Sequence, residues 1–242
     1  MNRDNLDQNV DEYLNPIPER QLDQRICSII AEYIIGRLEG PRILELGVGD
    51  QVYTPMLVQR FGDVTSVDGS GILLQRMATT LGSAAAGRWT PVLSYFEEYE
   101  PSVPFDNILA TNILEHVEDP VVVLSRCRDW LRPGGCAHIA VPNAGSLHRR
   151  LAVKMGLMQH VSQLGETDHR MGHKHCFSWI DLERYLVAAG FHIEHRQGLW
   201  AKLLPNAMLV NCSEAQLRGM VELGMELPID YAAVTYMVAR VR

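Results

Sequence analysis

The chain has 242 residues, of which 47% are hydrophobic and 21% are charged, and its formal net charge is -7. This length suits one α/β domain with a full core and is short for two. The negative charge argues against a nucleic-acid binder that works by counterion release. Five cysteines without C-x-x-C spacing favour free thiols in a reducing compartment, so we expect a cytoplasmic protein. No stretch approaches about 18 apolar residues and the polar N-terminus is no signal peptide, so we expect no membrane partner.

The first half of the chain alternates helical and strand patterns. A helix is predicted over 21–40, where apolar residues recur at helical spacing before Gly40-Pro41. A strand follows at 42–46. Thr54 and Pro55 predict a short helix to residue 61, with threonine as its N-cap. Further strands are predicted at 63–68, 90–94 and 105–111, with a helix over 71–82.

The second half adds an insertion to this pattern. A helix over 120–135, closed by Pro133-Gly134-Gly135, precedes a fifth strand at 136–143. Residues 144–177 combine a basic, helical piece with a histidine-rich loop. A helix at 179–189, a strand at 191–197, a helix at 213–227 and a strand at 232–241 complete the chain. The alternation predicts an α/β fold with seven strands, helices on both faces and one domain.

The turn after the first predicted strand, in ELGVGD, is the first motif. Gly47 and Gly49 let the backbone approach a ligand at the carboxyl end of the strand, where open α/β sheets bind ligands. Asp68 ends the next strand, 23 residues after Glu45, and can accept both hydroxyls of a ribose. A tight turn with a surface aspartate is the alternative. Val52 replaces the third glycine of the dinucleotide pattern, which argues against a nicotinamide cofactor.

Four segments in the range 42–143 carry a resemblance to a known family. They are ILELGVGD, VTSVDGS, FDNILATNILEHVEDP and LRPGGCAHIAVPN, in this order. Together they resemble the class I S-adenosylmethionine-dependent methyltransferase superfamily, and in particular its branch that methylates small molecules. The resemblance implies a Rossmann-like seven-stranded sheet, mostly parallel, whose antiparallel last strand lies between two others. It also implies S-adenosyl-L-methionine as cofactor and S-adenosyl-L-homocysteine as product.

The resemblance divides the chain, residues 1–242, into four parts of a single methyltransferase domain. Residues 1–40 form an N-terminal lid and helix, and residues 41–143 form the cofactor-binding core. Residues 144–177 are the insertion on the substrate side. Residues 178–242 complete the sheet with the order helix, strand, helix, strand.

The same resemblance implies which residues hold the cofactor. The turn from Glu45 to Gly49 would face its methionine part, Asp68 would bind the ribose hydroxyls, and Asn112 would border the methionine through its backbone. Gln51 stands where many members have a third glycine, and either bonds the cofactor or sets the turn. The full predicted set is Glu45, Gly47, Gly49, Gln51, Asp68, Gly69, Tyr95, Phe96 and Asn112, with the two aromatic residues along the adenine.

A hydroxyl acceptor requires a base, and histidine is the side chain best suited to that role near neutral pH. His116 follows the fourth strand near the expected cofactor, although it can equally pack the mouth of the sheet. His169 and His173 fall in the insertion, where this branch builds its acceptor pocket; a solvated polar loop is the alternative. We predict these three as candidate catalytic residues. The pattern D-H-x-x-x-H-x-H has no specific metal spacing, so no metal site is predicted.

Three more residues are predicted to contact the acceptor. Tyr13 lies in a segment, 10–20, that can fold over the site as a lid together with Arg20. Asn143 ends the fifth strand at the carboxyl edge of the sheet, and His175 belongs to the histidine-rich loop. An ordinary structural role is the alternative for each of them.

The sequence therefore predicts an S-adenosylmethionine-dependent methyltransferase acting on a hydroxyl of a small molecule, such as a sugar, a phenol or a secondary metabolite. TNIL replaces the N/D-P-P-Y tetrad after the fourth strand, which argues against nucleobase and glutamine methylation. An N-methyltransferase on a small amine and a non-catalytic cofactor-binding scaffold are the alternatives. We expect a monomer or a homodimer without a nucleic-acid partner.

Overall fold

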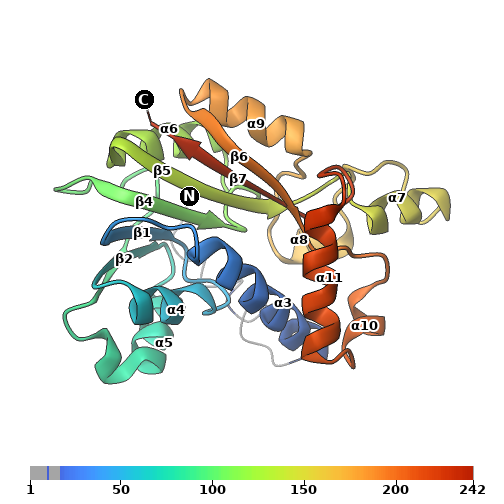
Figure 1. The fold of residues 1–242 in the computed structure, drawn as a ribbon, viewed down its shortest axis with the longest axis horizontal. Coiled ribbons are helices and arrows are strands. Elements are labelled where there is room, and N and C mark those ends of the chain that lie inside the picture. The colour runs from blue at the N-terminus through green and yellow to red at the C-terminus, as the bar shows by residue number, and fades with distance from the viewer. Residues whose placement is uncertain (1–9, 11–16, 242) are drawn as a thin grey trace.

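A twisted seven-stranded sheet forms the centre of the computed structural model in Figure 1, which describes residue 10 and residues 17–241. Its strand order is β3-β2-β1-β4-β5-β7-β6. The first five strands pair in parallel, and β7 lies antiparallel between β5 and β6, as the resemblance implies. The strands are β1 (Arg42–Leu46), β2 (Asp63–Asp68), β3 (Trp89–Leu93), β4 (Phe105–Thr111), β5 (Leu131–Pro142), β6 (His192–Leu199) and β7 (Val234–Arg240).

Helices cover both faces of this sheet. The helices are α3 (Pro18–Ile35), α4 (Tyr53–Arg60), α5 (Gly71–Leu81), the 3-10 turn η1 (Gly82–Ala85), α6 (Pro120–Trp130), α7 (Leu147–Lys154), α8 (Glu166–Arg170), α9 (Trp179–Ala188), α10 (Asn206–Leu209) and α11 (Glu214–Glu226). The buried side chains of α3, α4, α5 and α11 pack on one face, and those of α6 and α9 on the other. In the described part of the chain, no helix is long and apolar enough to cross a membrane.

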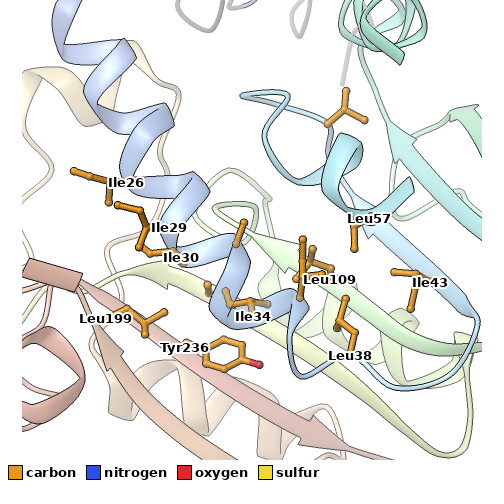
Figure 2. Close-up of a cluster of buried hydrophobic side chains, with 14 of the residues drawn as sticks. Ile26, Ile29, Ile30, Ile34, Leu38, Ile43, Leu57, Leu109, Leu199 and Tyr236 are labelled. Carbon is orange, nitrogen blue, oxygen red and sulfur yellow. The ribbon is translucent and has the colours of Figure 1, made fainter. Parts of the chain in front are cut away.

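The central strands are buried on both faces. Along β1, Ile43 packs on the α3 side of the sheet and Leu44 on the opposite side. Figure 2 shows the isoleucine stripe of α3, including Ile34, facing Leu199 and Tyr236 of the sheet. Each fully buried side chain of this kind contributes about 1.5–3 kcal/mol. The sheet is therefore a rigid base for the loops at its edges.

The predicted elements are largely confirmed, with differences at their ends. The helix predicted over 120–135 ends at Trp130, because residues 131–142 form one long strand. The start of that strand pairs with Phe105 across a register shift, so Pro133-Gly134-Gly135 lie within an irregular strand and do not close a helix. The first helix covers residues 18–35 and not 21–40, and α8 and α10 are short helices that were not predicted.

The prediction that Thr54 caps a helix is wrong. α4 begins at Tyr53, and no side chain caps its N-terminus. The buried Thr54 hydroxyl donates instead to Oε2 of Glu45, at 2.8 Å. Threonine before proline is typical of a helix start, but here the buried carboxyl group of β1 needs the hydroxyl as a donor.

Candidate active site

A cavity of about 340 Å³ opens at the carboxyl ends of β1, β2 and β4. β1 lies between β2 and β4, so the chain order reverses at this point of the sheet, which is where open α/β sheets bind ligands. The volume is within the usual range of small-molecule sites, about 300–1,000 Å³. Every residue predicted to bind the cofactor lines it: Glu45, Gly47, Gly49, Gln51, Asp68, Gly69, Tyr95, Phe96 and Asn112.

The loop after β1 approaches the cavity with a left-handed backbone. Gly47 has a φ of 76°, a conformation that favours glycine, and a Cβ atom there would lie 2.4 Å from Cδ1 of Ile113, so the end of that side chain would have to move. Gln51 also has a positive φ, 61°, which explains why glycine suits this position. Its Oε1 accepts a hydrogen bond from Thr80, whereas its buried Nε2 has no partner among the described residues. Gln51 therefore offers the cavity a donor.

Asp68 is fixed at the end of β2 by backbone donors. The N–H of Val48 donates to Oδ2 and the N–H of Ser70 donates to Oδ1, both at 2.8 Å, and the side chain is 8% exposed. A carboxylate has two oxygens that can each accept from a hydroxyl group, which is the chemistry that a ribose diol requires. The geometry fits the role predicted for this residue.

Glu45 lies deeper, at the base of the cavity. Its Oε2 accepts hydrogen bonds from Thr54 at 2.8 Å and from Ser66 at 2.6 Å, and Trp89 in turn donates to the Ser66 hydroxyl. Burial raises the pKa of Glu45 to about 7, and the hydroxyl donors offset this only in part. A positive charge bound beside Glu45 would favour its carboxylate form.

The turns after β3 and β4 form the sides of the cavity. The N–H of Ser94 donates to the carbonyl of Asp68 at 3.1 Å and ties the first turn to β2. Tyr95 and Phe96 follow it and line the cavity with aromatic rings, which suit a planar base. On the β4 side, Asn112 has a φ of 54° and the chain turns sharply there. These positions are those predicted for the adenine and methionine ends of the cofactor.

The insertion closes the remaining side. Met171, Gly172 and Lys174 line the cavity. The N–H groups of Lys174 and His175 donate to the carbonyl of Glu115, at 2.7 and 3.3 Å. The insertion is thus docked by its backbone on the segment that follows β4.

Two of the predicted histidines meet at this junction. His116 lines the cavity, and its ring centre lies 4.7 Å from that of His173, with the rings nearly perpendicular. Burial lowers the pKa of His116 to about 4, so its ring is neutral at pH 7 but is a weaker base than an ordinary histidine. Nδ1 of His173 lies 3.0 Å from Oδ1 of Asp168. Burial alone would raise the pKa of Asp168, but the hydrogen bonds from His173 and Gly165 outweigh it and the pKa is about 2.

The other predicted contacts lie elsewhere. His169 is exposed on α8 and Asn143 is 2% exposed, and neither is among the residues that line the cavity. The Asn143 amide donates to the carbonyls of Ile229 and Ala232, both at 2.9 Å, which is a structural use. Nε2 of His175 donates to the carbonyl of Val117 at 3.0 Å. None of these three residues lines the cavity.

The predicted lid falls mostly outside the described residues, and Tyr13 lies there. Arg20 is described: it belongs to α3 and forms an ion pair with Asp50, which lines the cavity. This ion pair attaches the first helix to the cofactor loop.

Sequence analysis did not single out Glu115, a buried carboxyl group next to His116 that is not among the residues lining the cavity. Its side chain is 1% exposed, and burial raises its pKa to about 7. It precedes His116 in the motif NILEHVEDP, but only the structure shows that it is enclosed by the insertion.

Comparison with known proteins agrees with the class that the fold and the cavity define, the class I S-adenosylmethionine-dependent methyltransferases. Residues 19–196 match the model of a family described as a methyltransferase domain, and the chain belongs to this family. The ubiquinone biosynthesis O-methyltransferase of Xylella fastidiosa (strain 9a5c) is 28% identical over 172 residues, which are 69% of this chain and 68% of that protein.

Solved structures share the fold. A S-adenosylmethionine-dependent methyltransferase from Mesorhizobium loti is 19% identical with a TM-score of 0.62, covering 94% of this chain and 99% of that one. The N-methyltransferase NodS from Bradyrhizobium japonicum WM9, solved with S-adenosyl-L-homocysteine, is 12% identical with a TM-score of 0.57, covering 94% and 90%. The protein is thus a methyltransferase that uses S-adenosylmethionine. An N-methyltransferase with this fold shows that the fold does not choose the acceptor atom.

Proposed function

We propose that the protein is an O-methyltransferase that moves the methyl group of S-adenosylmethionine to a hydroxyl of a small molecule, with a phenol, a sugar or another secondary metabolite as acceptor. The observation that carries the proposal is geometric: His116 lies on the cavity wall, and its ring contacts that of His173, which is paired with Asp168. The name of the Xylella fastidiosa relative, an O-methyltransferase, supports a hydroxyl acceptor.

The chemistry needs little more than positioning and a base. The acceptor oxygen attacks the methyl carbon in line with the carbon–sulfur bond, whose electron pair stays on sulfur. Correct orientation of the two reactants contributes at most about 7–11 kcal/mol, and a positioned base contributes roughly 10²–10⁴-fold. His116 or His173 takes the hydroxyl proton, and Asp168 stabilises positive charge on the His173 ring.

Every residue predicted for the cofactor lines one cavity, which supports cofactor binding; a non-catalytic cofactor-binding scaffold is the alternative that an activity screen distinguishes. Methylation of a small amine remains the second candidate, since an unprotonated amine needs no strong base. Five free cysteines support our expectation of a cytoplasmic protein, and we expect a monomer or a homodimer.

A methylation screen of hydroxyl and amine compounds, read by mass, tests the proposal. With the best hydroxyl acceptor, at least one of His116→Ala, His169→Ala and His173→Ala should lose tenfold or more of turnover. His116 and His173 are the first choices because His116 lines the cavity and the two rings are in contact. Binding of S-adenosylhomocysteine to each variant is the control for folding. Methylation of amines alone, with all three variants fully active, would contradict the proposal.

A further inference from the structure

Glu115 is a buried carboxyl group for which the fold provides no visible donor. Neither of its carboxylate oxygens has a hydrogen-bond partner in another described residue. Buried polar groups are nearly always satisfied, and an uncompensated buried charge costs several kcal/mol. Such a group needs a proton, a water molecule or a bound cation beside it.

Two histidines stand next to this carboxyl group. Glu115, His116 and His173 each offer one ligand atom, and these atoms all lie within 4.8 Å of one another. Nδ1 of His173 is engaged by Asp168, so Nε2 is the ring nitrogen that remains for a ligand. A carboxylate behind a histidine is the usual outer arrangement at metal sites, where it fixes the tautomer and the ring orientation.

The support for His173 extends further into the insertion. The N–H of Gly165 donates to Oδ2 of Asp168 at 2.8 Å, and Arg149 lies 3.5 Å from the same oxygen. The backbone bonds to the carbonyl of Glu115 hold the insertion against the segment that carries the other two side chains. The cluster is therefore built by the fold, from two segments far apart in the sequence.

We propose that Glu115, His116 and His173 bind one divalent transition-metal ion beside the cofactor cavity, whose wall includes His116. Two imidazoles and one carboxylate suit Zn²⁺, Co²⁺ or Mn²⁺, whereas Mg²⁺ and Ca²⁺ prefer oxygen ligands. Metal–ligand distances of about 2.0–2.2 Å would bring the three ligand atoms roughly 3.4 Å apart, so small side-chain movements complete the site. Three protein ligands leave a position open, as in catalytic metal sites.

The chemical role of the ion rests on the proposed function, but its binding does not. At the open position an acceptor hydroxyl would ionise more easily, as metal-bound water does, and its proton would pass to solvent water. The resulting oxygen anion forms the new carbon–oxygen bond while the carbon–sulfur bond breaks and its electron pair stays on sulfur. The ion then takes the place of a histidine base and narrows the acceptor to a hydroxyl compound.

The test is a titration of chelator-treated protein, without a polyhistidine tag, with Co²⁺ and with Zn²⁺. Calorimetry and the visible absorption of Co²⁺ should report one ion per chain. Glu115→Gln and His173→Ala should each lower the affinity at least tenfold. His160→Ala, an exposed histidine of the same insertion, should leave the affinity unchanged. Asp168→Asn should lower it about 10–100-fold, as loss of an outer partner does.

The outcomes separate this inference from the proposed function. Absence of Co²⁺ and Zn²⁺ binding, or equal affinity in Glu115→Gln and the unaltered protein, would overturn the metal site. Circular dichroism and the thermal shift with S-adenosylhomocysteine, measured on the same samples, show whether each variant is folded. Metal binding without transfer to any hydroxyl would overturn the O-methyltransferase proposal and leave the site intact.

Discussion

Glu45 should make the free protein less stable as the pH rises through neutrality. Its side chain is 3% exposed, and burial raises its pKa from an ordinary 4.5 to about 7. The folded chain therefore keeps a proton that the unfolded chain releases above pH 4.5. Stability that is fully present below pH 4.5 is lost as the pH rises to about 7.

The size of the effect follows from the two pKa values. Over a pH range that spans both pKa values, their difference corresponds to about 3 kcal/mol of unfolding free energy. About 2.5 kcal/mol of this is lost between pH 5 and pH 8. Glu45→Gln keeps the shape of the side chain and an oxygen acceptor for Thr54 and Ser66, but it cannot titrate. Glu115 also has a pKa of about 7, but its contribution to the pH dependence of stability is the same in Glu45→Gln and in the unaltered protein, so it cancels in their difference.

Urea unfolding of the cofactor-free protein at pH 5, 6, 7 and 8 measures the effect. The difference in unfolding free energy between Glu45→Gln and the unaltered protein should shift by about 2.5 kcal/mol in favour of the variant from pH 5 to pH 8. Glu222→Gln, at an exposed position of α11, is the control and should show no such shift. A difference that stays constant with pH would refute the burial of a titrating carboxyl group at Glu45.

Three further predictions test the cavity and the packing around it. S-adenosylhomocysteine at a hundred times its Kd should stabilise the protein by about 2.7 kcal/mol, read as a higher Tm, and a shift with NAD alone would contradict the cofactor. Asp68→Ala should weaken that binding at least tenfold in calorimetry, unlike Asp63→Ala at the opposite end of β2; equal affinities would remove the ribose role. Gly224→Ala should lower the free energy of unfolding in urea by more than about 1 kcal/mol, because the new Cβ atom would lie 2.2 Å from the backbone nitrogen of Trp200. Gly219→Ala, in open space on the same helix, should stabilise the protein by about 0.5–1 kcal/mol. Equal changes in unfolding free energy for the two variants would contradict the close packing of Gly224 on Trp200.

The sequence predicted the sheet and the cofactor side of the site because both depend on local patterns. Buried parallel strands need continuous apolar runs, and β2 and β4 match their predicted ranges. The glycine turn at Gly47 and the carboxylate of Asp68 at the end of β2 can each be recognised from a few adjacent residues. Short-range information of this kind is enough to place a ligand at the edge of the sheet.

The acceptor side depends on contacts that no local pattern encodes. Asn143 looks the same in sequence whether its amide faces a ligand or, as here, the carbonyls of Ile229 and Ala232. Thr54 is a good helix cap until a buried carboxyl group from β1 requires its hydroxyl. In both cases a partner distant in the sequence decides which of two local structures forms.

Glu115 links the two sides of the cavity. Its carbonyl accepts hydrogen bonds from the backbone N–H groups of Lys174 and His175 in the insertion, and its neighbour His116 lines the cavity. The residues predicted to hold the cofactor lie mainly in turns that follow β1, β2 and β3, and residues of the insertion line the same cavity. A buried carboxyl group at the junction needs either a proton or a cation, and the two histidines beside it suit a cation. The segment after β4 thus joins the cavity predicted for the cofactor to the cluster of Glu115, His116 and His173.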